Sequence, residues 1–149
     1  YALDVLAEYQ IPINLIQLEI LETDASVDSK LLIRFLQIFK SSGFSLAMDD
    51  FGSGYSSLGM FNSMPIDCLK LDKSFFDSWQ PDMSERDSCL IKYMIKAAHD
   101  TGRTVVAEGI EEKFQVDLLR QYDCDMIQGY YFSKPLPAEE FASKMHKRV

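Results

Sequence analysis

Residues 46–58 read LAMDDFGSGYSSL, and they carry the strongest local signal in the chain. The apolar run over 46–48 is typical of a buried strand, whereas the two aspartates that follow cannot stay ionised side by side without compensation. Two glycines and three serines then predict a flexible polar loop. Paired carboxylates and such a loop at the end of a strand are typical of the functional rim of an α/β sheet.

Strand-like and helix-like segments alternate on both sides of this stretch. Short apolar runs predict strands at 16–21, 46–48, 68–72, 105–107 and 126–129. Helical spacing predicts helices over 31–39, 89–102, 114–122 and 137–145, the first with candidate caps Ser26 and Asp28 and a stop at Gly43. The alternation predicts parallel strands in an open doubly wound sheet or in part of a (β/α)8 barrel. No glycine-rich phosphate loop follows the first strand, which weakens the nucleotide-binding doubly wound alternative.

Composition excludes several classes of function. The chain has 149 residues, 47% of them hydrophobic and 26% charged, which predicts one soluble globular domain. The net charge of −8 disfavours binding to DNA, RNA or an anionic membrane surface. No apolar run is long enough to span a bilayer, and no basic leader opens the chain. Three cysteines without metal-site spacing favour a reducing cytoplasm.

Polar side chains fall at the ends of the predicted strands. Because parallel strands direct their carboxyl ends to one rim, we expect the following residues to lie together: Glu19, Asp49, Asp50, Lys70, Asp72, Glu108 and Gln128. Strand parity places Glu19 with Gln17 and Leu21, apart from its apolar neighbours. Lys70 lies between two leucines, so its side chain should face a polar interior or pair with a carboxylate.

Clustered carboxylates either have raised pKa values or bind a divalent cation. An oxygen-only donor set suits Mg²⁺ or Mn²⁺, and adjacent aspartates suit a two-metal site for in-line displacement at phosphorus. Bound metals would also let an acidic protein bind an anionic phosphodiester.

The order and spacing of six motifs resemble those of the EAL-domain family, the phosphodiesterases of bacterial cyclic-di-GMP. These motifs are LEILE at 18–22, residues 49–58, LKLD at 69–72, AEGIE at 107–111, IQGY at 127–130 and SKPL at 133–136. The resemblance implies a (β/α)8 barrel and metal-dependent hydrolysis of cyclic-di-GMP to the linear dinucleotide. The family's usual threonine is replaced here by Leu21.

The resemblance also implies a role for each rim residue. Glu19 would bind the first metal, Asp49 would bridge the two metals, and Asp50 and Glu108 would bind the second. Lys70 would contact the attacking water and Gln128 would help to hold the water or the metal shell. Among the supporting residues, Asp72 matches an active-site position, and Glu22 matches the glutamate that anchors the loop after Asp50.

The glutamate that names the family, and the asparagine of the next strand, have no counterpart in residues 1–149. We therefore expect the C-terminal part of an EAL domain, with about five of the eight βα units, that is inactive by itself. Expected partners are cyclic-di-GMP, a second copy of the chain, and upstream sensory or cyclase domains. A non-catalytic module that binds cyclic-di-GMP or protein, and an unrelated barrel phosphodiesterase, are the alternatives.

Overall fold

The computed structural model describes residues 2–23, 29–52 and 62–146. Its elements, in chain order, are α1 (Ala2–Glu8), η1 (Ile13–Leu15), β1 (Gln17–Leu21), α2 (Ser29–Ser41), β2 (Ser45–Phe51), β3 (Cys68–Leu71), η3 (Lys73–Phe75), α4 (Glu85–Asp100), β4 (Thr104–Ala107), α5 (Lys113–Gln121), β5 (Met126–Ile127) and α6 (Ala138–His146). Five strands form one sheet in the order β1-β2-β3-β4-β5, and every neighbouring pair is parallel. The predicted α/β alternation is confirmed. A sequential order fits a barrel segment, whereas a doubly wound sheet reverses its order at a switch point.

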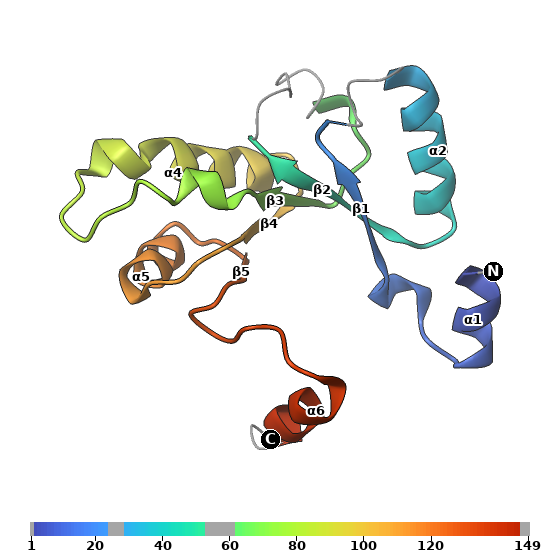
Figure 1. The fold of residues 1–149 in the computed structure, drawn as a ribbon. Helices are drawn as coiled ribbons and strands as arrows, with labels where there is room; N and C mark the ends of the chain where they lie inside the picture. The colour runs from blue at the N-terminus through green and yellow to red at the C-terminus, as the bar shows by residue number, and fades with distance from the viewer. Residues whose placement is uncertain (1, 24–28, 53–61, 147–149) are drawn as a thin grey trace.

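The hydrophobic core lies between one face of the sheet and its helices. Parallel strands in sequential order, joined by right-handed crossovers, place all connecting helices on the same face. Figure 1 shows α2 beside β1 and β2, with α4 and α5 beside β3, β4 and β5. The core cluster combines alternate strand residues with one stripe of each helix, including Leu46, Met48, Leu69, Leu71, Val105 and Ala107 from the strands and Leu36, Ile91, Ile95, Val116 and Leu119 from the helices. The other face of the sheet carries the strand residues that do not belong to this core.

Several boundaries differ from the sequence-based expectations. The second strand continues to Phe51, so both aspartates of the LAMDDF run lie inside it. Only Met126 and Ile127 form the last strand, which leaves Gln128 just beyond it. The final helix begins at Ala138, one residue after the expected start. The candidate caps Ser26 and Asp28, and the loop residues 53–58, lie outside the described residues.

Two aspartates link the amino-terminal ends of β2 and β4 to the helices α2 and α4. Oδ2 of Asp67 accepts a hydrogen bond from the Leu46 amide (3.0 Å), and its carboxylate pairs with Lys40 of α2. In the same way, Oδ2 of Asp125 accepts from the Val105 amide and lies 2.8 Å from Nε2 of His99 on α4. These two aspartate contacts hold the amino-terminal edge of the sheet, opposite the carboxyl ends of the strands.

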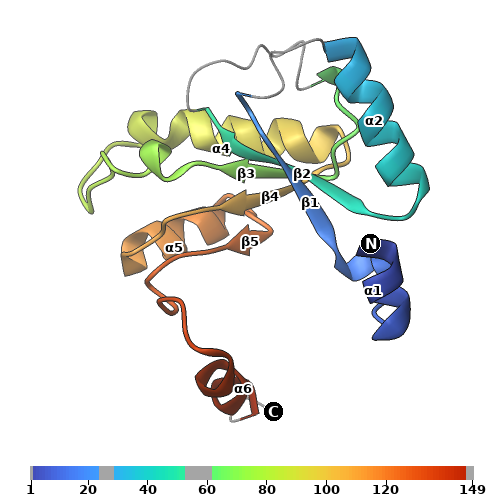
Figure 2. The same ribbon diagram turned by 45° about the vertical axis from the view of Figure 1, so that its right-hand side comes forward.

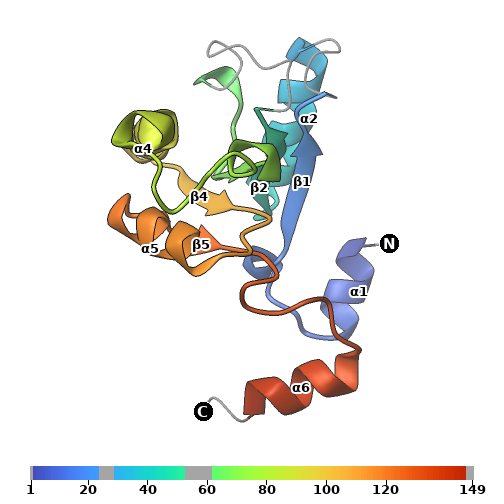
Figure 3. The same cartoon turned by 60° about the vertical axis from the view of Figure 1, so that its left-hand side comes forward.

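The C-terminal helix α6 is set apart from the sheet and is joined to it by the segment that follows β5 (Figure 2, Figure 3). Phe141 and Met145 on this helix are about half exposed, at 56% and 50%. Of the helices in the described ranges, none combines the length and the apolar character that crossing a bilayer requires.

Candidate functional site

The face of the sheet away from the helices carries the polar residues. Near its middle, Ala47, Cys68 and Val106 form a small buried cluster separate from the main core. Because side chains alternate with a period of two along a strand, the next residues on this face are Asp49 of β2, Lys70 of β3 and Glu108, which directly follows β4. The strands thus deliver a lysine and two carboxylates to one rim.

Lys70 is the centre of an ion-pair network. Its Nζ atom lies 2.7 Å from Oε1 of Glu19, 2.8 Å from Oδ1 of Asp49 and 3.1 Å from Oε1 of Glu108. The side chain is only 9% exposed, while that of Glu19 is 46% exposed. Lys70 therefore faces the polar side and pairs with carboxylates, as its parity predicts, and it joins residues of β1, β2 and the end of β4.

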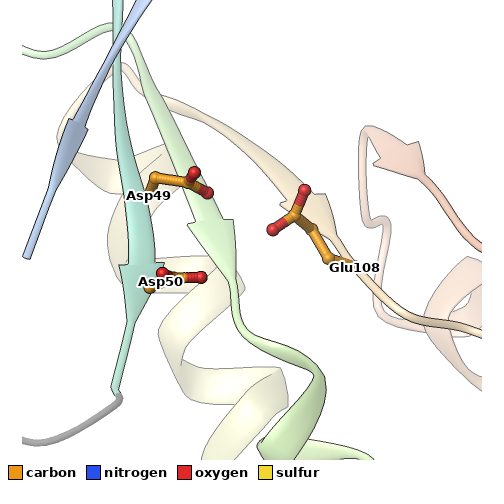
Figure 4. A group of neighbouring side chains, drawn as sticks. All are labelled: Asp49, Asp50 and Glu108. Carbon is orange, nitrogen blue, oxygen red and sulfur yellow. The ribbon is translucent and has the colours of Figure 1, made fainter.

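Asp50 reaches the same site although strand parity would direct it to the opposite face. The register between β2 and β3 shifts between Met48 and Phe51, and Asp50 has a left-handed backbone with φ 54°. A shift of this kind re-aims side chains. Oxygen atoms of Asp49, Asp50 and Glu108 consequently all lie within 4.8 Å of one another. Figure 4 shows Asp49 and Asp50 projecting together from β2 toward Glu108.

The clustered charges shift the pKa values of the site. Desolvation, followed by the negative charges of Asp49 and Asp72, raises the pKa of Asp50. Desolvation also raises the pKa of Glu108, against the lowering effect of Lys70. Burial alone would lower the pKa of Lys70, but its carboxylate partners outweigh that effect and raise it. Lys70 is thus held as an ammonium ion. Its single positive charge does not balance the three carboxylates of the cluster, Asp49, Asp50 and Glu108.

The donor set fits a divalent metal ion. Asp49, Asp50 and Glu108 each offer a carboxylate oxygen, the donor that hard cations prefer. In addition, Oδ1 of Asp49 is buried and forms an ion pair with Nζ of Lys70 at 2.8 Å. Three clustered carboxylates beside a single ammonium group could therefore bind a metal.

Glu19 and Gln128 are not among the three clustered carboxylates. Glu19 joins them through Lys70. The backbone of Gln128 is hydrogen-bonded on both sides: its amide donates to Ala107 O (2.8 Å), and its carbonyl accepts from Ile110 N (3.1 Å). The exposed side chain of Gln128 lines a cavity of about 380 Å³ with Phe132 and residues of the α6 region.

The supporting residues lie around the turn that follows β2. Glu22 is 1% exposed, and its Oε2 accepts a hydrogen bond of 2.6 Å from the Gly52 amide. Asp72 caps η3, because its Oδ1 accepts from the Ser74 amide at 3.0 Å, and this bonding lowers the pKa of Asp72. Alternation and motif spacing do not reveal the register shift at Asp50; the only sequence signal for it is the pair of adjacent aspartates followed by Phe51 and Gly52.

Comparison with known proteins gives a consistent result. A family model described as the EAL domain matches residues 2–135. The chain is 39% identical over 129 residues to "Cyclic di-GMP phosphodiesterase NbdA" of Pseudomonas aeruginosa, which covers 85% of this chain and 16% of that protein.

Solved structures agree in fold. The EAL domain of Mycobacterium smegmatis DcpA superposes with a TM-score of 0.88 at 30% identity, over 98% of this chain and 65% of that one. The PaMucR phosphodiesterase, solved as a c-di-GMP complex, gives a TM-score of 0.82 at 27% identity, over 93% of this chain and 55% of that one. The chain spans less than two thirds of the length of each of these three relatives.

Proposed function

The chain belongs to the EAL domain family, and on that premise we propose that it forms part of a phosphodiesterase domain that hydrolyses cyclic-di-GMP to the linear dinucleotide. The observation that carries the proposal is the Lys70-centred network beside the Asp49, Asp50 and Glu108 cluster. Further support comes from the name of NbdA and from the c-di-GMP complex of PaMucR.

Each residue of the site has a proposed role. Glu19, Asp49, Asp50 and Glu108 would hold two divalent ions, Mg²⁺ or Mn²⁺, which suit an all-oxygen donor set. Such ions, when bound, lower the pKa of a water and offset the charge of the phosphodiester. Lys70 holds the attacking water by donating a hydrogen bond to it, and its fixed charge stabilises the negative charge that develops at phosphorus. By the resemblance alone, the side-chain amide of Gln128 would help to hold the water or the metal shell.

Activity is proposed for the complete domain. The chain covers 55–65% of the two solved structures described above, so a further segment of the domain would supply the remaining strands and the remaining ligands of the first metal. A second copy of the chain, upstream sensory or cyclase domains and a cytoplasmic location remain predictions.

One observation favours a second candidate, a module that binds cyclic-di-GMP without hydrolysis. Lys70 already pairs with Glu19, Asp49 and Glu108, so the site is partly charge-compensated before any metal binds. A site that persists without metal can hold a ligand without catalysing its hydrolysis.

Hydrolysis by the 149-residue chain, and by a form extended upstream toward a ~250-residue barrel, tests the proposal. Both would be incubated with cyclic-di-GMP and Mn²⁺, with the isosteric Asp49→Asn variant as the matched control and chromatography of the products as the readout. Turnover by the extended form that Asp49→Asn abolishes is the expected result. Turnover retained in Asp49→Asn would contradict the assigned site, and binding without turnover in both forms would favour the second candidate.

A further inference from the structure

The turn that aims Asp50 is strained and must be held in place. Asp50 has φ 54°, and Gly52, two residues later, has φ 97°. Left-handed backbone is disfavoured for most residues with a side chain, less so for aspartate and asparagine, and surrounding contacts help to hold it in place. The contacts around residues 50–52 therefore decide whether the Asp50 carboxylate stays beside Asp49.

Two side chains from different parts of the chain hold this turn. Directly after β1, the buried Glu22 accepts a hydrogen bond of 2.6 Å from the Gly52 amide. From η3, the ring of Phe75 lies directly against Gly52: a Cβ atom at position 52 would lie 2.0 Å from Phe75 Cζ and 2.1 Å from Cε2. The ring thus occupies the space that any side chain at position 52 would need.

Phe75 is itself placed by the end of the strand that carries Lys70. η3 directly follows β3 and Asp72, and the Phe75 amide donates to Asp72 O at 3.2 Å while Ser74 bonds the Asp72 carboxylate. The Asp72 amide in turn lies 3.5 Å from the carbonyl oxygen of Phe51. The segment of Asp72 and η3 therefore connects β3, the strand that carries Lys70, to the turn at residues 50–52.

We propose that Phe75 is a positioning residue, whose ring, packed on Gly52, holds the left-handed turn that brings the Asp50 carboxylate into the cluster with Asp49 and Glu108. This rests on the proposed function insofar as the cluster binds metal. Phe75 does not touch the reacting atoms; it acts through Gly52 and the backbone of Asp50. The Phe75 ring packs against Gly52, and Glu22 accepts a hydrogen bond from the Gly52 amide. Two side chains therefore hold the same residue.

Mn²⁺ affinity, measured by calorimetry on the purified protein, tests this role. Phe75→Ala should weaken Mn²⁺ binding about tenfold, the usual effect of losing a group that orients a ligand. Phe75→Leu should restore part of the affinity, because it keeps most of the apolar volume. Phe114→Ala is the matched control, since Phe114 of α5 is also partly buried against the main core. It should lower the melting temperature and leave Mn²⁺ affinity unchanged. A loss of melting temperature alone in Phe75→Ala would overturn the proposal.

A second measurement does not depend on metal. Gly52→Ala should lower the melting temperature of the metal-free protein strongly, because its Cβ would overlap the Phe75 ring. In the Phe75→Ala background the same change should lower it less, since only the backbone strain remains. Equal losses in the two backgrounds would overturn the proposal. If the form extended upstream binds no Mn²⁺, the proposed function fails, while this pair of variants still decides whether Phe75 holds the turn.

Discussion

The carboxylates of Asp49 and Asp50, neighbours in one strand, lie on the same side of the sheet and in the same cluster with Glu108. In a regular strand consecutive side chains point to opposite faces. The register shift in β2 and the left-handed Asp50 remove that alternation at one place only. The site therefore gains a second aspartate from a single strand, at the cost of local backbone strain.

Replacing Asp50 by glycine should separate stability from metal binding. Asp50→Gly relieves the left-handed strain and removes a carboxylate from a repulsive cluster, so the free energy of unfolding without metal should rise by about 1 kcal/mol. Mn²⁺ affinity should fall at the same time. Asp50→Asn is the control, because asparagine tolerates left-handed backbone and keeps the turn. Urea unfolding and calorimetry check both quantities, and a less stable Asp50→Gly would contradict the strain.

Lys70→Met should destabilise the metal-free protein. The change removes the cation between Glu19, Asp49 and Glu108, and breaking such a pair costs about 3 kcal/mol when the partners stay desolvated. Added Mn²⁺ should restore much of the loss, since a metal ion can compensate the same carboxylates. Lys73→Met, which breaks an exposed pair with Glu111, should change urea unfolding little. Equal effects of the two variants would show that Lys70 is not the charge centre.

Glu22→Ala should lower the free energy of unfolding by about 2–3 kcal/mol. The variant removes the charged acceptor of the Gly52 amide and empties the space of a side chain that is 1% exposed. Glu22→Gln retains an acceptor oxygen and should lose less. Urea unfolding of the three proteins gives the comparison, and an equal loss in the two variants would point to packing rather than to the hydrogen bond.

The Asp125 contact predicts a pH dependence with a definite sign. Bonding to His99 and to the Val105 amide outweighs desolvation and holds the pKa of Asp125 below 3.8. A lowered folded-state pKa contributes stability above the unfolded value, and that contribution is lost as the pH falls through the folded value. The stability difference between the wild type and Asp125→Asn should thus be full at neutral pH and shrink below pH 3.8.

The comparison requires urea titrations of both proteins across this range. Asp100→Asn, which removes an exposed partner of Lys96, serves as the control and should give a small difference at every pH. A wild-type advantage that grows on acidification would contradict the assigned sign.

The sequence predicts the arrangement of the strands and the facing of Lys70 because both follow from simple alternation. Lys70 lies between Leu69 and Leu71, which pack in the main core, so its own side chain must face the other way. Glu19 likewise alternates with half-buried Leu18 and Ile20. These features depend on residues within one strand, which a sequence displays directly.

Other features depend on contacts that no local pattern records. The position of Asp50 follows from a register shift between two strands, and the last strand stops after two residues, which places Gln128 outside it. The ring of Phe75 meets Gly52 only after residues 23 positions apart have been folded together. Such non-local contacts set the detailed geometry of the site, whereas alternation sets its location.

The separation of the sheet into two faces has a consequence for how this protein can change over generations. Substitutions at Asp49 or Glu108 alter a face of the sheet that lies apart from the core formed with α2, α4 and α5. The proposed catalysis could therefore be lost by a single mutation at this face while the core still folds. A lineage with this architecture can drift from a hydrolytic enzyme to a receptor, and selection for signalling can retain the receptor after the chemistry has gone.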